Sequence, residues 1–296
     1  MTTYTYVARN KLRSVLLIGL FIGFIALIGH IFGLVYGDSE GSILAAFIFA
    51  CISSFVGYFF SDKIALAVNG AKPIQESDDP ELYHLVENLA VTAGIPMPKL
   101  YMINDPSPNA FATGRNPQHS ALAVTVGLRQ MMNKSELEGV LAHEMSHIGN
   151  YDILFMTLVS VMVGTISMLA DWFMRYGLWG RSSNDRENRN TNPIFLILGI
   201  TLIVLSPIIA TIIQLAVSRK REYLADASGA LLTRYPEGLA NALEKIKNNA
   251  QPLKRANSAT AHMYISNPLN TNSLSKLFST HPPLEERIKI LREMNI

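Results

Sequence analysis

Long apolar segments alternate with polar segments along this chain, and four of the apolar segments have membrane-spanning length. They cover residues 14–36, 43–60, 153–170 and 194–217, and about 20 predominantly apolar residues suffice for a helix to cross a bilayer. A signal peptide is the competing interpretation of the first segment, but its apolar run is too long and no small-residue cleavage site follows it. The pattern therefore predicts four transmembrane helices.

The polar segments have the patterns of a water-facing domain built from helices and short strands. Residues 80–93 place apolar side chains on one stripe of a helix. Three short runs of alternating or β-branched residues, separated by turn residues, predict a small antiparallel sheet. These runs cover residues 99–103, 109–113 and 121–126. The expected fold class is mainly α with this small antiparallel sheet (α+β), and helices are also expected at 239–246 and 283–294.

The four spans divide the chain into two membrane hairpins and two polar parts. The hairpins are expected at 1–60 and 153–217, and the polar parts at 61–152 and 218–296. Because two spans separate the polar parts, both parts are expected on the same side of the membrane. A site shared between the two polar parts is therefore possible.

Loop charges predict the orientation of the spans. Lys and Arg are enriched in cytoplasmic loops, and basic residues occur before the first span and directly after the fourth, whereas the first loop has none. Both termini and the polar parts are therefore expected in the cytoplasm. One loop disagrees, because three arginines lie between the third and fourth spans. The basic residues before the first span are Arg9, Lys11 and Arg13, and those after the fourth are Arg219, Lys220 and Arg221. The three arginines of the disagreeing loop are Arg181, Arg186 and Arg189.

Composition agrees with a membrane protein and excludes several kinds of site. The chain of 296 residues is 49% hydrophobic and only 16% charged, which is too apolar for an ordinary soluble enzyme. Its net charge of +2 and the lack of a basic run with interleaved aromatic residues argue against nucleic acid as a partner. Cys51 is the single cysteine, so a metal site must use histidine and carboxylate ligands.

A His-Glu-x-x-His segment that begins at His143 is the strongest chemical signal in the chain. On an α-helix His143 and His147 lie one turn apart on the same face, so both imidazoles can bind one metal ion. Glu144 occupies the position of the general base in zinc peptidases with this motif. Ser135 as N-cap, with Glu138 completing a capping box, is expected to begin the helix. The motif also arises by chance, so the interpretation requires a third ligand.

Glu222 and Asp226 are the expected complement to these histidines. They lie four residues apart, one helical turn, and a catalytic zinc usually has three protein ligands and one open position. Glu222 is therefore the expected third ligand, and Asp226 is expected to accept the free N–H of a ligand histidine. The alternative is that both carboxylates are solvated and pair with Arg219 or Arg221.

Four segments of the chain together resemble the HtpX family of bacterial membrane zinc metallopeptidases, which is related to the eukaryotic endopeptidases that process prenylated CaaX proteins. The segments are PNAFATG at 108–114, AHEMSHIGNYD at 142–152, SRKREYLAD at 218–226 and STHPPLEERI at 279–288. The resemblance covers essentially the whole chain. It implies an ATP-independent endopeptidase of the bacterial plasma membrane, with one Zn²⁺ per subunit, that acts in quality control of damaged or misassembled membrane proteins.

Zinc peptidase chemistry assigns expected roles to the remaining candidates. Glu144 takes the proton of the attacking water and passes it to the leaving nitrogen. His281 is the candidate donor to the developing oxyanion, and its alternative role is to cap or orient the closing helix. Asn109 and Ala110 are expected on an edge strand that pairs with an extended substrate; a purely structural strand is the alternative.

The expected partners are polypeptide substrates, above all membrane proteins, and the lipid bilayer. Two other functions stay open: a non-catalytic membrane scaffold that carries the motif, and a processing peptidase for specific lipidated substrates. A decayed enzyme would be expected to have lost Glu144 or a ligand, which argues against the scaffold. Four spans argue against the large intramembrane chamber of a prenyl-protein peptidase.

Overall fold

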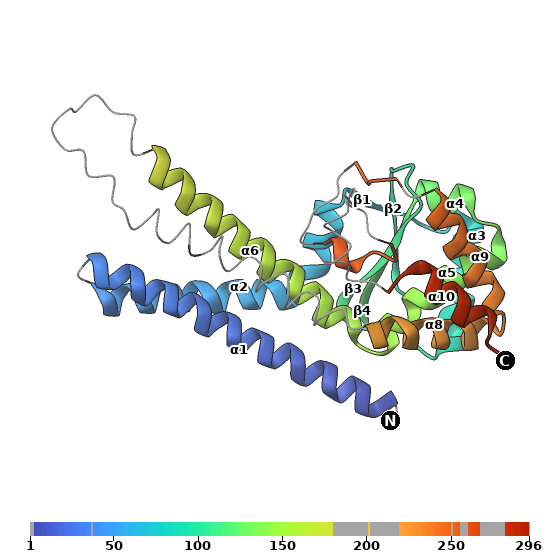
Figure 1. Cartoon of the computed structure of the whole chain (residues 1–296), viewed down its shortest axis with the longest axis horizontal. Coiled ribbons are helices and arrows are strands. Elements are labelled where there is room, and N and C mark those ends of the chain that lie inside the picture. The colour runs from blue at the N-terminus through green and yellow to red at the C-terminus, as the bar shows by residue number, and fades with distance from the viewer. Residues whose placement is uncertain are drawn as a thin grey trace.

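The computed structural model describes residues 3–36, 38–179, 201, 219–249, 251–254, 260–266 and 282–295. Three long helices extend to one side of a globular part that contains a four-stranded sheet and shorter helices (Figure 1). The long helices are α1 (Thr3–Tyr36), α2 (Ser39–Val68) and α6 (Asp152–Trp179). The expected class, mainly α with a small sheet, is confirmed.

Each of the long helices is long and apolar enough to cross a membrane. The qualifying stretches are Val7–Leu34, Glu40–Val68 and Asp152–Asp171. Large apolar side chains on α1 and α2 are exposed around much of the helix surface, an arrangement that is stable in lipid but not in water. The first three predicted spans are thus helices of spanning length. The predicted fourth span, 194–217, lies outside the described residues except for Thr201.

The four-stranded sheet is mixed, so the prediction of a purely antiparallel sheet is wrong. Its order is β1-β2-β4-β3; β1 pairs with β2 and β3 with β4 in antiparallel fashion, whereas β2 and β4 are parallel. The chain passes from β2 to the outer strand β3 first, and β4 then returns between them, so β4 runs in the direction of β2. The strands are β1 (Ala71–Pro73), β2 (Lys99–Ile103), β3 (Ala110–Asn116) and β4 (His119–Thr125).

The shorter α-helices pack around the sheet and share one apolar core. α3 has the predicted bounds, and its stripe of Leu82, Leu85, Val86 and Leu89 is buried in that core. Asp79 accepts from Leu82 N–H at its start, and Gly94 ends it in the left-handed conformation. The shorter helices are α3 (Pro80–Ala93), α4 (Val126–Met131), α5 (Lys134–Gly149), α8 (Arg219–Thr233), α9 (Pro236–Asn248), η1 (Ala261–Met263) and α10 (Leu284–Arg292).

Helix α5 begins two residues earlier than expected, and its predicted cap is wrong. Asn133, not Ser135, is the N-cap, and Glu136 rather than Glu138 completes the capping box. The Asn133 side chain accepts from Glu136 N–H at 2.9 Å, and the Glu136 carboxylate accepts from Asn133 N–H at 2.9 Å. The Ser135 hydroxyl instead donates to the Asn133 side chain. The two capping patterns overlap in the sequence, and the hydrogen bonds of Asn133 and Glu136 show which of them forms.

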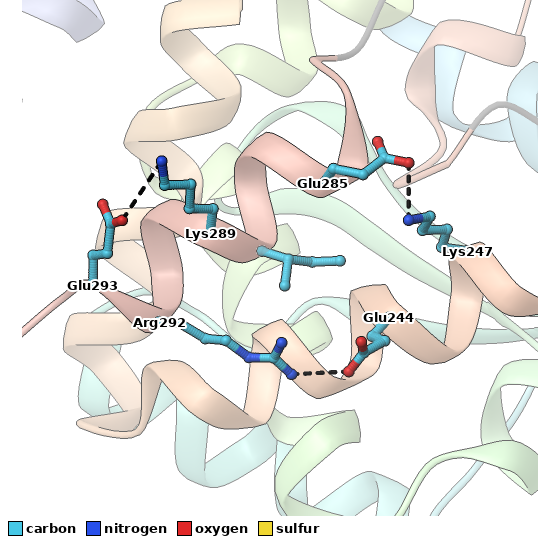
Figure 2. A pocket seen from close by; sticks show the side chains of 7 residues that line it. Glu244, Lys247, Glu285, Lys289, Arg292 and Glu293 are labelled. Atoms are coloured by element: carbon cyan, nitrogen blue, oxygen red, sulfur yellow. Dashed lines mark hydrogen bonds and ion pairs between the residues drawn. The ribbon is translucent and has the colours of Figure 1, made fainter.

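The outer face of α10 forms a shallow charged pocket against α9 (Figure 2). Its charges pair with one another: Arg292 Nη2 lies 2.8 Å from Glu244 Oε2, and Lys247 Nζ lies 2.9 Å from Glu285 Oε1. Such partly exposed pairs contribute little to stability. The residues that line this pocket join two helices and lack the convergent, buried groups of a reaction site.

Gly229 permits the close crossing of α8 over α5. A Cβ atom at this position would lie 2.9 Å from His143 N and 3.1 Å from His143 Cα, closer than non-bonded atoms approach. Because His143 is on α5 and Glu222 on α8, this contact sets how near the two side chains come. A residue without a side chain is therefore required here.

Replacing this glycine should separate the two helices. We expect Gly229→Ala to lower the free energy of unfolding by about 1–3 kcal/mol, the usual range for overpacking, and to weaken metal binding. The matched control is Gly149→Ala in α5, where a Cβ would meet nothing within 4 Å and a stability change of at most about 1 kcal/mol is expected. Chemical unfolding in detergent and metal titration measure both effects, and equal behaviour of the two variants would contradict the close-crossing argument.

Candidate active site

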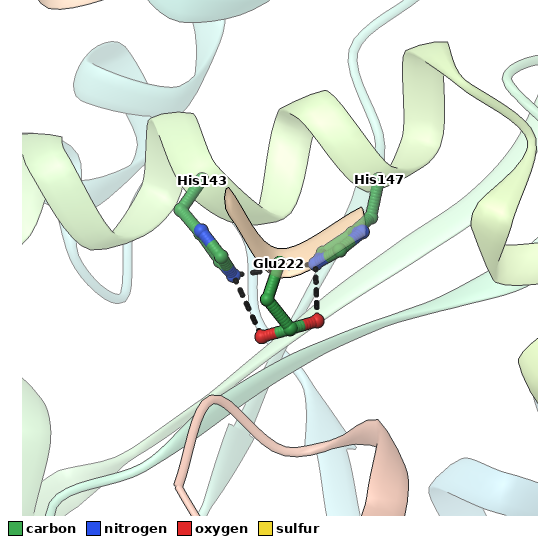
Figure 3. Close-up of side chains that lie close together, drawn as sticks. All are labelled: His143, His147 and Glu222. Carbon is green, nitrogen blue, oxygen red and sulfur yellow. Dashed lines mark hydrogen bonds and ion pairs between the residues drawn. The ribbon is translucent and has the colours of Figure 1, made fainter. Parts of the chain in front are cut away.

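Three potential metal ligands converge where α8 crosses α5. One ligand atom from each of His143, His147 and Glu222 lies within 4.8 Å of the others, and all three side chains are buried. The two Nε2 atoms are 3.2 Å apart. Glu222 points between them from the neighbouring helix, with Oε1 3.5 Å from His147 Nε2 and Oε2 3.9 Å from His143 Nε2 (Figure 3). This donor set can hold a metal ion.

The outer nitrogen of each histidine faces a buried carboxylate. His143 Nδ1 lies 2.9 Å from Asp226 Oδ1, and His147 Nδ1 lies 3.1 Å from Asp152 Oδ2. These contacts favour a proton on Nδ1 and direct each Nε2 inward, where it can bind a metal ion that displaces any proton it carries. The predicted placement of Asp226 beside a ligand histidine agrees with this geometry. Asp152 was missed because it follows the end of α5, outside the helical spacing that identified the other residues.

The pKa values of these groups reflect burial and close charges. Burial lowers the pKa of His143. Burial acts in the same direction on His147, but the Asp152 hydrogen bond and the Glu222 charge raise the pKa of His147 to about 9. Burial would raise the pKa of Asp226, whereas the Arg287 charge and the His143 hydrogen bond hold it below its ordinary value. His147 therefore lies in the more negative surroundings of the two histidines.

Arg287 on α10 is a site residue that the sequence did not identify. Its side chain is fully buried, with Nε 2.8 Å from Asp226 Oδ2 and Nη2 2.7 Å from Asp226 Oδ1. Nη1 lies 3.5 Å from Glu222 Oε2 and donates to Ile265 O at 3.3 Å. The residue thus neutralises two buried acids at once. Its only sequence signal is its place in the segment 279–288, since no helical spacing links it to Glu222.

Glu144 lies next to the ligand group and against strand β3. It is buried, and burial raises the pKa of Glu144 to about 8. The His147 charge and a hydrogen bond with the Ala112 backbone oppose that rise, whereas the Glu222 charge adds to it. A carboxyl group with a pKa near neutrality can accept and return a proton.

Ala110 begins β3, the outer strand of the sheet, and Asn109 directly precedes it, but a segment of the chain itself pairs with both. Ala110 O accepts from Ile265 N–H at 3.0 Å, and the Asn109 side-chain amide donates to Ser266 O at 3.0 Å. Phe111 and Tyr264 form an antiparallel bridge next to these bonds. Their role toward a substrate stays a prediction. His281 lies outside the described residues.

Comparison with known proteins places these features in a peptidase family. The profile of peptidase family M48 matches residues 76–295. A protein named protease HtpX homolog from Tropheryma whipplei (strain Twist) is 47% identical over 293 residues, covering 98% of each chain. A protease HtpX homolog from Caldanaerobacter subterraneus subsp. tengcongensis is 46% identical over 297 residues, covering 100% of this chain and 99% of its own. These similarities extend across the membrane helices.

A solved structure shares the fold. The crystal structure of S. mikatae Ste24p superposes with a TM-score of 0.52 at 24% sequence identity, covering 97% of this chain and 67% of that chain. At this identity the likeness concerns the fold alone. It includes the helices that project from the globular part as well as that part itself.

Removing the buried guanidinium should disturb both stability and the metal site. We expect Arg287→Met to lower the free energy of unfolding by about 3–5 kcal/mol, because Asp226 would remain as a buried charge without its partner. Arg287→Lys should recover only part of the loss, since one ammonium cannot replace two parallel N–H donors. Unfolding curves of the metal-free protein measure this.

Arg292→Met is the matched control on the same helix. Arg292 is 41% exposed in its side chain and pairs with Glu237 and Glu244 at the surface. We expect this variant to unfold almost like the parent. If both methionine variants were equally stable, the proposed dependence on the buried Arg287 would be wrong.

Proposed function

The chain belongs to peptidase family M48, and we propose that this membrane metalloprotease uses zinc to hydrolyse peptide bonds in damaged or misfolded proteins of the bacterial plasma membrane. The observation that carries the proposal is the buried group of His143, His147 and Glu222 with Glu144 beside it. The relatives named HtpX protease homologues, which match almost the full length of the chain, support the same activity.

The donor set supports zinc as the metal. Two imidazoles and one carboxylate, with an open fourth position, are the protein ligands of many catalytic zinc sites. Two nitrogens each about 2.1 Å from a zinc ion and at a tetrahedral angle would lie about 3.4 Å apart, and the two Nε2 atoms are separated by 3.2 Å. Asp226 and Asp152 already fix the outward nitrogens. We propose one Zn²⁺ per subunit at this position.

Glu144 is the proposed proton carrier of the reaction. When bound, zinc supplies Lewis-acid activation of the scissile carbonyl and of a water molecule. The Glu144 carboxylate takes a proton from that water as the water oxygen forms its bond to the carbonyl carbon. The same carboxyl group then gives the proton to the amide nitrogen as the C–N bond breaks, which leaves a carboxyl and an amino terminus. Its buried position keeps bulk water from exchanging this proton.

The substrate is proposed to lie extended along the edge of β3, with Asn109 and Ala110 as hydrogen-bond partners. Ile265 and Ser266 make those bonds in the chain itself, so an incoming peptide must displace residues 264–266. His281 is the proposed donor to the oxyanion, with orientation of α10 as its alternative role. Polypeptides, chiefly membrane proteins, are the proposed partners, and no nucleotide or nucleic acid takes part.

The proposed topology places both termini and the site in the cytoplasm. Basic residues near the start of α1 and in the first turn of α8 support it by the positive-inside rule. The proposed parts remain a first hairpin at 1–60, a second at 153–217, and catalytic parts at 61–152 and 218–296. A scaffold without activity is disfavoured by the family and by Glu144, and processing of lipidated substrates remains the alternative as a substrate class.

Replacing the proposed proton carrier should abolish cleavage and spare the metal. We expect Glu144→Gln to reduce the cleavage rate of an unfolded protein substrate about 10²- to 10⁴-fold, with zinc content unchanged. The control is Glu138→Ala on the same helix. Cleavage assays and metal analysis of the purified proteins measure both quantities, and an undiminished rate for Glu144→Gln would refute the mechanism.

Replacing the proposed third ligand should remove the metal as well as the activity. We expect Glu222→Ala to lose zinc during dialysis against a chelator that leaves the parent loaded, and to lose cleavage with it. Added zinc should restore activity to chelator-treated parent protein but not to this variant. Full metal retention by Glu222→Ala would remove this residue from the ligand set.

A further inference from the structure

Asn10 joins the first membrane helix to the turn that follows the histidine helix. It lies near the start of α1, is 4% exposed, and donates from Nδ2 to Asn150 O at 3.0 Å and to Asp152 Oδ1 at 2.8 Å. A carbonyl and a carboxylate both act only as acceptors, so the amide nitrogen must be the group that faces them. Both hydrogen bonds of this side chain therefore attach α1 to the turn at the C-terminal end of α5.

Asp152 connects this contact to the ligand group. Its Oδ1 accepts from Asn10, and its Oδ2 lies 3.1 Å from His147 Nδ1. Arg221 has its Nη1 3.6 Å from Asp152 Oδ1, too far for a hydrogen bond. Of the contacts in the described residues, those of Asn10 and His147 are the two hydrogen bonds that orient this carboxylate.

The turn between α5 and α6 needs such support. Tyr151 has φ of 60°, a left-handed conformation that costs a residue with a Cβ about 1–2 kcal/mol. Asn10 binds the residue on either side of it. Lys11, the next residue of α1, places Nζ 4.5 Å from the centre of the Tyr151 ring, a second contact from the same helical turn. Asn10 and Lys11, which lie on one turn of α1, thus contact the strained segment between α5 and α6 and the Asp152 carboxylate within it.

We propose that Asn10 is a positioning residue that acts through Asp152 to hold His147 in its metal-binding orientation. The inference rests on the proposed function, because it presumes that His147 binds a metal. It makes α1 part of the metal site, although this helix precedes the region 76–295 that matches the family profile. The membrane hairpin is then more than an anchor.

Zinc affinity, measured by competition with a coloured chelator, tests the proposal. Direct partners of ligand histidines are worth about 10- to 100-fold in metal affinity, so for Asn10, one contact farther out, we expect a loss of roughly 3- to 10-fold in Asn10→Ala. Asn10→Leu, which keeps the volume, should lose as much. The visible spectrum of bound Co²⁺ should change in both variants, because it reports the ligand geometry.

Ser14→Ala is the matched control, one turn along the same helix. Ser14 is buried, and its hydroxyl donates within α1 to Asn10 O at 3.0 Å. This variant should bind zinc like the parent. Zinc affinity unchanged in Asn10→Ala, or weakened equally in Ser14→Ala, would overturn the proposal.

A double-mutant cycle tests whether Asn10 affects the metal site through Asp152. In an Asp152→Ala background, Asn10→Ala should cause no further loss of zinc affinity, because its route to His147 is already removed. The same loss in both backgrounds would overturn the proposed route. The variant His147→Ala tests the proposed metal site itself. If it bound zinc as tightly as the parent, the proposed site would be wrong. If His147→Ala lost zinc affinity but Asn10→Ala did not, only the role of Asn10 would be refuted.

Discussion

The buried ion pair between Arg287 and Asp226 is the interaction on which the site depends. Glu222 and Asp226 lie one turn apart on α8 with 1% of each exposed, and two such carboxylates would repel each other and lose their hydration. Arg287 donates hydrogen bonds to both carboxylate oxygens of Asp226 and lies near the Glu222 carboxylate. Burial would raise the pKa of Asp226, but the Arg287 charge lowers it, and the Asp226 carboxylate in turn orients His143.

Local spacing predicted the centre of the site, and contacts distant in sequence completed it. His143 and His147, like Glu222 and Asp226, each lie one helical turn apart, so their common faces follow from the geometry of a helix. Arg287 and Asn10 reach the site only through tertiary packing, which helical periodicity does not predict. Asp152 reaches it through the turn that ends α5, five residues after His147.

The same division holds for the fold. The apolar stripe of α3 and the strand β2 were predicted with their observed bounds, because both patterns are local. The parallel pairing of β2 with β4 was not, since strand order depends on which strands meet after the chain has turned. At α5, two overlapping capping patterns lay two residues apart, and only the hydrogen bonds of Asn133 and Glu136 distinguish them.

Arg287 lies far from the histidine helix in sequence, and this separation has a consequence for biosynthesis. About 140 residues separate it from His147, and ribosomes add roughly 5–20 residues per second. A nascent chain therefore carries its histidine pair for roughly 7–28 seconds before the guanidinium that neutralises the ligand acids has been translated. Until α10 has been translated and has docked, Glu222 and Asp226 lack the guanidinium that lies beside them in the folded protein.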